Sequence, residues 1–599
     1  MGGMLGTARI LRSPVGVALP VLFLLSATGA AAQVAPPITP QTREEIERAP
    51  IRPNVQTRPR LTIEGGVERA PCALDNEASR NVRFTVSSVV FEDLRGLDAE
   101  ALRPAYQEFV GTEQPVAVIC EIRDRAATIL RDAGYVAAVE VPEQRIADGT
   151  VRFQVLMAKL VGIRVRGNAG TAEQTIAAYL QRLTEQEVFN RNTAERYLLL
   201  AGDIPGYDVR LSLRSANAGR GEVIGEVAVL SNPGRVDFNV QNFGSKDLGR
   251  FGGLIRGEFY GLTGLGDRTT LAAFSTADFE EQQTIQVGHD FRVGSEGLTL
   301  SGQFTYAWAE PDTGDPNLEI KARTLLATAE ASYPFLRTQV ETARAVFGLD
   351  FVNQRVRFND IPLTRDNLRV AFARLDMEAI DPASLSGGSA GAPRWRVAAN
   401  IQVRQGLAIL DASEGCGRNL SRCAAAGVVP PSRFEGDPTG TLIRVEGQGE
   451  FRAMPNISFA LGARAQYSGD PLLSFEEFSA GNYTVGRGYD PGTLLGDQGI
   501  GFQAELRFGN LAPKAADAIA AQPYVFFDAA RVRNEDRLSV PVGSQTLASA
   551  GAGVRAVYGD RAQLDVVLAV PLKRAGLFTE RPDPRLLVSL TTRLWPWSF

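Results

Sequence analysis

The chain has 599 residues, which is too long for one ordinary domain and predicts three or four packed units. Charged residues make up 22% and the formal net charge is -5, so the chain lacks the basic excess of nucleic-acid-binding proteins. Its 60 Gly, 30 Phe and 13 Tyr favour many short strands and turns. We therefore expect a mainly β protein without a nucleic-acid partner.

Residues 1–32 have the pattern of a secretory signal peptide. Arg9 and Arg12 precede an apolar run from Val15 to Leu25, and small residues end the segment just before Gln33. The alternative is an uncleaved membrane anchor, but the apolar run is short and contains a proline. We expect export, with the mature chain beginning near Gln33. Further along, no run of about 18 apolar residues occurs, so a membrane-spanning form must be a β-barrel.

The four cysteines point to disulfides in an exported protein. The economical pairing joins Cys416 to Cys423 across a short polar segment, and Cys72 to Cys120. Four free thiols are the alternative. A metal site is a poorer interpretation, because His289 is the single histidine and no cysteine pair has CxxC spacing. We therefore predict neither a metal nor a cofactor.

The segment between the signal peptide and the first folded unit reads as a linker. This linker comprises residues 33–72. From Gln33 to about Gly65 it is rich in Pro, Arg and Glu and poor in aromatic residues, with one short helix predicted from Thr42 to Ala49. The sequence leaves open what this helix does.

Two small α+β units of the same order follow in tandem. Residues 73–158 predict a strand, two helices and two strands: Phe84–Phe91, Ala99–Phe109, Val116–Ala133, Val136–Val141 and Val151–Leu156. Residues 159–230 repeat the order with Leu160–Val165, Thr171–Leu183, Asn190–Ala201, Val209–Arg214 and Glu222–Leu230. In the second helix of the first unit, apolar residues from Ile119 to Leu130 share one face, as a helix on a small sheet requires.

Residues 231–599 alternate between apolar and polar side chains. Between Phe502 and Phe508 every second residue is apolar, whereas Gln503, Glu505 and Arg507 are polar, and residues 552–558, 564–570 and 586–594 behave similarly. A soluble β-sandwich would also alternate, but it would not need so long a series of long strands. We expect a transmembrane β-barrel of about 16 antiparallel strands, with lipid outside and water inside.

Several segments resemble a known family. The tandem units resemble POTRA domains through Pro142-Glu143-Gln144 with Asp148-Gly149 in the first unit and Leu198-Leu199-Leu200 with Pro205-Gly206 in the second. The chain from about Cys72 to Phe599 looks like a two-partner secretion transporter (TpsB; FhaC, ShlB and HecB type) of the BamA superfamily. Cys72 and Cys120 suit the cysteine pair that the first POTRA domain of that family often carries.

Two motifs carry the resemblance furthest. Arg487-Gly488-Tyr489 is similar to the [VI]RGY motif on the sixth extracellular loop of the family, which folds back into the barrel lumen; Gly486 stands where the branched residue is usual. Phe526 to Ala530 resembles the FxDxG strand segment, with Asp528 at the acidic position and Ala530 in place of Gly. A guanidinium inside a lumen needs an acceptor such as a carboxylate, so Asp528 is the predicted partner of Arg487.

We find no motif in the sequence that indicates an enzyme. His289 has no nucleophile elbow near it, no GxxxxGK[ST] phosphate loop occurs, and Glu476 and Glu477 are paired only in sequence. We expect no catalytic residues and no nucleotide.

The resemblance implies a monomeric transporter in outer-membrane lipid. It would bind a secreted TpsA-type exoprotein through periplasmic POTRA domains and pass it through the barrel to the cell surface. An outer-membrane protein insertase is one alternative, although such relatives usually have more POTRA copies. A passive porin or receptor is the second, and it would not need the POTRA pair.

Overall fold

The computed structural model describes residues 41–47, 61–63, 72, 74, 79, 81–146, 148–216, 221–315, 317–386, 393–417, 420–515, 517–535, 543–576 and 580–596. The predicted signal peptide, residues 1–32, lies outside these described residues. Among the described residues, no helix is long and apolar enough to cross a bilayer.

The first α+β unit contains two small sheets and one long helix. Its elements are β2 (Arg83–Thr85), β3 (Ser88–Glu92), the 3-10 helix η1 (Ala99–Ala105), β4 (Glu113–Pro115), α2 (Val118–Asp132), β5 (Ala137–Glu140) and β6 (Thr150–Met157). The sheet order is β3-β6-β5, with β2 and β4 forming a separate pair. Helix α2 buries Ile119, Ile122, Ala126 and Leu130, as its pattern predicts. Cys120 of this helix is joined to Cys72.

Two predicted elements of this unit are wrong in their bounds. The single strand expected from Phe84 to Phe91 is two strands in different sheets, because buried Val86 bridges to Val110 and the next residues turn toward Gly149. The helix expected from Ala99 to Phe109 is a shorter 3-10 helix that contains Pro104. Proline lacks the N–H that a continuing α-helix would use.

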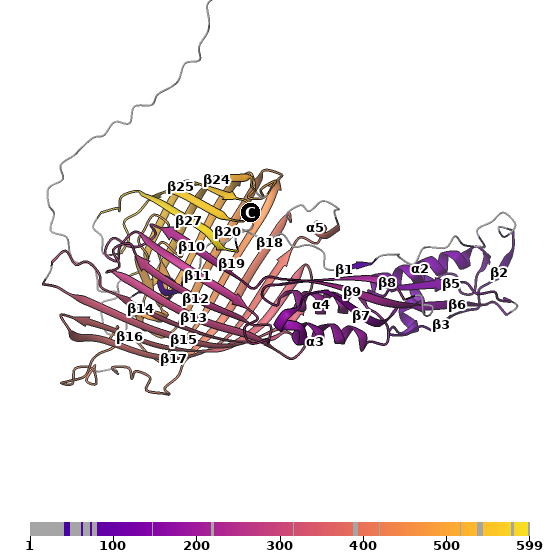
Figure 1. Ribbon diagram of the computed structural model, residues 1–599, viewed down its shortest axis with the longest axis horizontal. Coiled ribbons are helices and arrows are strands. Elements are labelled where there is room, and N and C mark those ends of the chain that lie inside the picture. The colour runs from indigo at the N-terminus through magenta and orange to yellow at the C-terminus, as the bar shows by residue number, and fades with distance from the viewer. Residues whose placement is uncertain are drawn as a thin grey trace, which may run out of the picture. The chain divides into compact units, whose positions relative to one another are not determined.

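The second unit repeats the order with β7 (Lys159–Gly167), η2 (Gly170–Ala172), α3 (Glu173–Thr184), α4 (Arg191–Gly202), β8 (Tyr207–Ser215) and β9 (Glu222–Ser231). Asn190 caps α4 by accepting hydrogen bonds from the backbone N–H groups of Asn192 and Thr193. Strand β1 (Leu61–Ile63) lies parallel to β8, giving the sheet order β1-β8-β9-β7. A segment of the predicted linker therefore extends this sheet (Figure 1).

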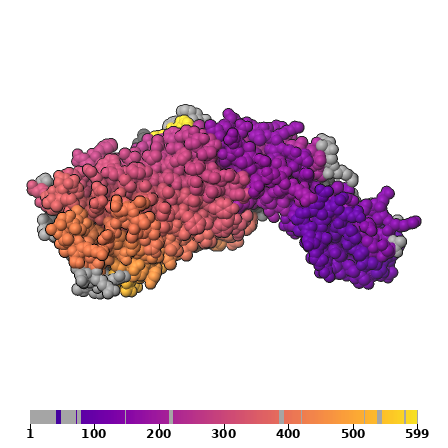
Figure 2. All heavy atoms as spheres, turned by 90° about the horizontal axis from the view of Figure 1, so that it is seen from below, coloured from indigo at the N-terminus to yellow at the C-terminus, as the bar shows by residue number. Residues whose placement is uncertain are grey.

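Sixteen of the remaining strands form one closed antiparallel barrel (Figure 1). Its 16 strands, all within the described residues, are β10 (Gly234–Gln241), β11 (Gly252–Tyr260), β12 (Arg268–Thr276), β13 (Gln282–Val293), β14 (Leu298–Ala309), β15 (Ile320–Arg337), β16 (Glu341–Phe358), β17 (Ile361–Ile380), β18 (Trp395–Gly406), β19 (Thr441–Met454), β20 (Ile457–Ser468), β23 (Gln498–Phe508), β24 (Ile519–Arg533), β25 (Gln545–Tyr558), β26 (Ala562–Pro571) and β27 (Arg585–Trp595). The short helix α5 (Ala383–Ser386) follows β17. Except at the seam between β10 and β27, neighbouring barrel strands follow one another in sequence. The colour of the surface in Figure 2 accordingly changes gradually from magenta to orange.

Strands β10 and β27 close the barrel. Asn239 donates hydrogen bonds from Nδ2 to Ser589 Oγ and Thr591 Oγ1, each at 2.9 Å, so side chains reinforce the backbone ladder at this seam. Along β23, apolar side chains face outward and polar side chains face the lumen, as predicted. Phe502 on the outer face is 41% exposed, whereas Glu505 points into the lumen and is bound there.

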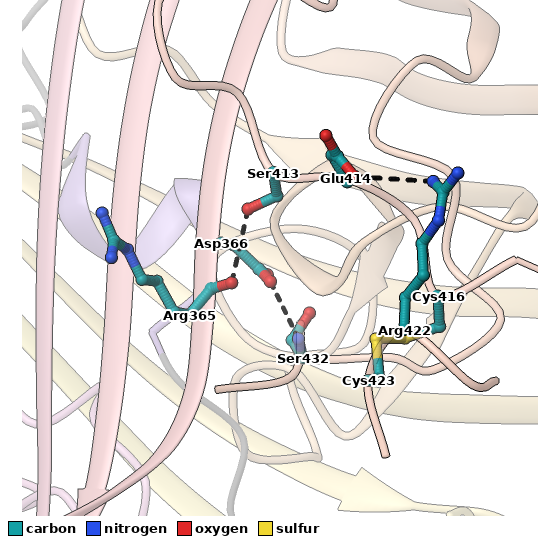
Figure 3. Close-up of a disulfide and its surroundings, with 8 residues drawn as sticks. All are labelled: Arg365, Asp366, Ser413, Glu414, Cys416, Arg422, Cys423 and Ser432. Carbon is teal, nitrogen blue, oxygen red and sulfur yellow. Dashed lines mark hydrogen bonds and ion pairs between the residues drawn. A yellow bond between two sulfur atoms is a disulfide. The ribbon is translucent and has the colours of Figure 1, made fainter. Parts of the chain in front are cut away.

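Two long loops lie at the far end of the barrel, away from the end where β10 begins. The disulfide loop, residues 407–440, joins β18 to β19, and Cys416 is bonded to Cys423 within it (Figure 3). The backbone N–H of Ser432 donates to Asp366 Oδ1 at 2.8 Å, which ties this loop to β17 (Figure 3). The RGY loop, residues 469–497, joins β20 to β23 and carries the motif described above.

Peptide mapping under non-reducing conditions tests the covalent connections. We expect proteolysis of the mature protein to yield Cys416 joined to Cys423 and Cys72 joined to Cys120, because both pairs are bonded in the fold. Each linked peptide should separate after reduction. Free thiols at these positions, or crossed pairs, would contradict the connections.

Candidate functional site in the barrel lumen

The RGY loop folds back against the inner wall of the barrel. It contains the 3-10 helix η3 (Ser474–Glu476) and a short hairpin of β21 (Phe478–Ala480) with β22 (Leu494–Gly496). Its apolar side chains form a buried cluster with wall residues of β24 and β25 and with Ala575, which follows β26. The cluster comprises Phe478, Ala480, Val485, Tyr489, Leu494, Ala530, Val532, Leu547 and Ala575. Apolar packing thus holds the loop against the wall, in addition to its ion pairs.

Arg487 at the tip of this loop is bound by the wall. Its Nε donates to Asp528 Oδ2 at 3.0 Å and its Nη2 to Asp528 Oδ1 at 2.7 Å, while its backbone N–H also donates to Oδ2 at 3.0 Å. Asp528 is fully buried. The guanidinium lies 3.7 Å from the centroid of the Phe526 ring. The structure thus brings together the arginine, the aspartate and the phenylalanine that the sequence singles out, in a bidentate ion pair above an aromatic ring.

The glycines beside Arg487 allow the close approach. Gly486 has a φ of +120°, and a Cβ there would lie 2.7 Å from Leu547 Cδ1. At Gly488 a Cβ would lie 2.9 Å from Ser549 Cβ. Gly486 therefore stands where a branched residue would not fit, and Val485, one position earlier, supplies the buried apolar side chain.

Tyr489 anchors the other side of the motif. Its side chain is buried, and its Oη lies 2.8 Å from the carbonyl oxygens of both Ala548 and Lys573. The backbone N–H of Gly488 donates to Ser549 Oγ at 3.3 Å. All three residues of the motif thus contact the barrel wall.

Glu505 is a member of this site that the sequence analysis did not single out. It accepts hydrogen bonds from Arg487 Nη1 at 2.6 Å and from Arg555 Nη2 at 2.9 Å, and it pairs with Arg507 at 2.7 Å. Strand alternation did place Glu505 on the lumen face. Alternation did not predict that Arg487 would contact Glu505 on β23 in addition to Asp528 on β24.

A short segment of the N-terminal linker also lies inside the barrel. Helix α1 (Arg43–Ile46) begins with a capping box, in which Thr42 and Glu45 bind each other's backbone N–H groups. Gln286 on β13 donates to the carbonyl of Ile46 at 2.8 Å, and Gln354 on β16 donates to the carbonyl of Gln41 at 3.3 Å. The helix predicted from Thr42 to Ala49 therefore forms in part, and residues 48 and 49 lie outside the described residues.

Charged contacts hold α1 to the wall and to the RGY loop. Arg43 Nη2 lies 3.0 Å from Asp350 Oδ2 on β16 and 2.9 Å from Glu476 Oε1 in the RGY loop. Glu44 pairs with Arg464 on β20 at 2.8 Å. One helical turn thus bridges two parts of the wall and the loop.

Ile46 adds an apolar contact to this arrangement. It is buried in a cluster with Leu473 and Phe475 of the RGY loop and with wall residues Ala307, Leu326, Val352, Leu368 and Val370. Burial of one such side chain stabilises the contact by about 1.5–3 kcal/mol. The helix is therefore held by a few interactions, far fewer than a strand of the wall has.

Glu476 connects the helix to the loop. Besides Arg43, it binds Arg404 on β18 through Nε at 2.8 Å, and Arg444 on β19 lies 3.4 Å away. Burial alone would raise the pKa of Glu476, but Arg404, Arg43 and Arg444 outweigh it and hold the pKa below its ordinary value. The neighbouring Glu477 pairs with Arg433 of the disulfide loop at 3.2 Å.

The remaining predicted residues lie apart from this centre. His289 is in β13, where its Nδ1 lies 3.0 Å from Thr269 Oγ1. Cys72 and Cys120 belong to the first α+β unit, and Cys416 and Cys423 lie in the disulfide loop. The lumen centre therefore consists of the RGY motif, its acidic acceptors, and the α1 contacts that the sequence did not predict.

A double-mutant cycle tests the ion pair between Arg487 and Asp528. Arg487→Ala leaves a fully buried carboxylate without its main partner, so we expect it to destabilise the barrel by about 3–5 kcal/mol. Arg487→Ala combined with Asp528→Ala should cost less than the two single changes together. Urea unfolding in phospholipid vesicles, followed by tryptophan fluorescence, measures each free energy of unfolding. Arg531→Ala, an exposed position on the same strand, is the control; additive single effects would refute the coupling.

Comparisons with known proteins agree with this architecture. Solved structures of CdiB share the fold: the protein from Escherichia coli is 14% identical with a TM-score of 0.70, covering 86% of this chain and 92% of that chain. CdiB from Acinetobacter baumannii is 17% identical with a TM-score of 0.63, covering 89% and 94%. No curated protein matches the chain.

Family patterns match both parts of the chain. Residues 84–157 match the POTRA domain of ShlB type, which includes most of the first α+β unit. Residues 227–556, more than half of the chain, match the haemolysin secretion/activation protein family ShlB/FhaC/HecB. The chain belongs to this family and is a two-partner secretion transporter with POTRA domains and an outer-membrane β-barrel.

Proposed function

We propose that this transporter binds an unfolded exoprotein in the periplasm and passes it through its barrel to the cell surface, as a monomer and without an enzymatic step. One observation carries the proposal: the lumen holds two segments, α1 and the RGY loop, that are not strands of the wall. Both segments can leave without breaking a ladder of the closed sheet. A passive pore would have no need for either.

The POTRA sheets provide the surface for an extended substrate. An exposed edge strand offers unpaired backbone groups, to which another chain can add as a further strand. In the first POTRA domain, β5 is an edge strand of the sheet β3-β6-β5. In the second, β1 already occupies the edge beside β8. The other edge strand of that sheet is β7, so the exoprotein can add to β5 of the first POTRA domain or to β7 of the second.

The linker connects substrate binding to the lumen in this proposal. Fourteen residues, 47–60, separate α1 from β1, so the chain between them spans at most about 50 Å when fully extended. While β1 remains paired with β8, helix α1 therefore stays within about 50 Å of that strand. The direction of transport would come from folding of the exoprotein outside, since no nucleotide-driven step is part of the proposal.

Bilayer conductance tests whether α1 closes the lumen. Arg43→Ala removes the contacts to Asp350 and Glu476, so we expect the open fraction in planar bilayers to rise about tenfold, the effect of roughly 1.4 kcal/mol. Arg103→Ala, an exposed arginine of the first POTRA domain, should leave conductance unchanged. Equal conductance of Arg43→Ala and the wild type would show that α1 does not close the pore.

Removal of the POTRA domains tests substrate recognition. Deletion of residues 73–230 should abolish binding of the exoprotein, because it removes both α+β sheets. Binding is measured by co-purification with the exoprotein, and heat-modifiable migration shows that the barrel still folds. If the deleted form binds the exoprotein as well as the full chain, the recognition site lies in the barrel.

A further inference from the structure

The outer face of the barrel carries an apolar groove that is independent of the lumen. The groove lies over strands β18, β19, β20, β23 and β24 and has a volume of about 700 Å³. This volume is within the range of about 300–1,000 Å³ in which protein pockets hold small molecules. Its walls are almost entirely apolar, as the lipid-facing side of a barrel requires.

Strand register explains the shape of the groove. One row of directly opposed residues crosses the five strands near their POTRA-side ends and is bulky: Trp395, Phe451, Phe459, Leu506 and Val525. The next row, two residues further into the membrane, is Val397, Gly449, Leu461, Ala504 and Phe527. Gly449 and Ala504 therefore leave a hollow in the outer surface, because they have no side chain or only a methyl group. This hollow is adjacent to the row that contains three aromatic residues.

A cation stands at the mouth of the groove. Arg394 immediately precedes the bulky row, and its guanidinium lies 5.5 Å from the centroid of the Phe451 ring. Arg394 is exposed, and among the described residues it forms no ion pair with a carboxylate. Aromatic residues of a barrel mark the level of the membrane interface, where lipid head groups lie. Arginine binds phosphate through paired hydrogen bonds.

We propose that this groove is a specific binding site for one phospholipid of the periplasmic leaflet. One acyl chain lies over Gly449 and Ala504, between the bulky side chains, and the head-group phosphate binds Arg394. A phospholipid fits both features, because it combines an apolar chain with an anionic group at interface depth. Basic residues beside membrane-spanning elements recognise lipid head groups in this way.

The site also lies behind the lumen centre. Strands β23 and β24 present Ala504 and Phe527 to the groove, and the adjacent residues Glu505 and Asp528 bind Arg487 on the other side of the wall. A bound acyl chain therefore packs against the two strands that hold the RGY loop.

Retention of lipid by the purified full-length protein tests the proposal. The protein is washed in a detergent without phosphate, and bound phospholipid is quantified by mass spectrometry of an organic extract. We expect about one phospholipid for each wild-type chain. Gly449→Leu and Ala504→Leu fill the groove and should abolish retention. A Cβ at Gly449 would lie 3.5 Å from Val397 Cγ1, an ordinary contact, so the wall accepts the change.

Two further variants make the test specific. Arg394→Gln, outside the strands, should weaken retention about tenfold, the factor that follows from loss of one charge-assisted hydrogen bond. Ala329→Leu on β15, an exposed alanine opposed by Gly302 and Leu349, is the matched control and should retain the lipid. Heat-modifiable migration verifies folding of every variant. Absence of lipid from the wild type, or equal retention by all folded variants, would overturn the proposal.

Discussion

The structure depends on closure of the sheet between β10 and β27. In a bilayer every backbone N–H and carbonyl must find a partner within the protein, and a closed sheet satisfies this demand without helices. Closure also creates an interior that water and charged side chains can occupy. Alternation along each strand then places polar residues inside and apolar residues outside. The ion pairs of the lumen and the apolar outer groove are two results of this one constraint.

The charges of the lumen are arranged to join parts that are separate in the sequence. Asp528 and Glu505 on the wall bind Arg487 of the RGY loop, whereas Glu476 of that loop binds Arg43 of α1 and Arg404 of the wall. A buried ion pair contributes little net stability, because desolvation offsets most of the attraction. A pair with one missing partner is strongly unfavourable. These ion pairs therefore fix the positions of α1 and the RGY loop in the lumen, because an unpaired charge is costly. They add little net stability to the bound arrangement, so the two segments can still separate from the wall.

The sequence predicted most of the fold and part of the site. Alternation between Phe502 and Phe508 was sufficient to assign lumen and lipid faces, since a strand has only two sides. The resemblance to the family paired Arg487 with Asp528. Strand β1 and the contacts of α1 were not predicted, because three or four residues of a polar linker carry no periodicity. Glu476 was set aside as a mere neighbour of Glu477, since only the fold brings three arginines to it.

The disulfide loop has a consequence for biogenesis. Cys416 and Cys423 are seven positions apart, so their sulfurs meet by local motion of a short peptide and need no long-range contact. The periplasm is an oxidising compartment, and the chain passes through it before insertion. This part of the loop can therefore acquire its covalent ring while the strands are still unpaired, and it reaches the cell surface already constrained.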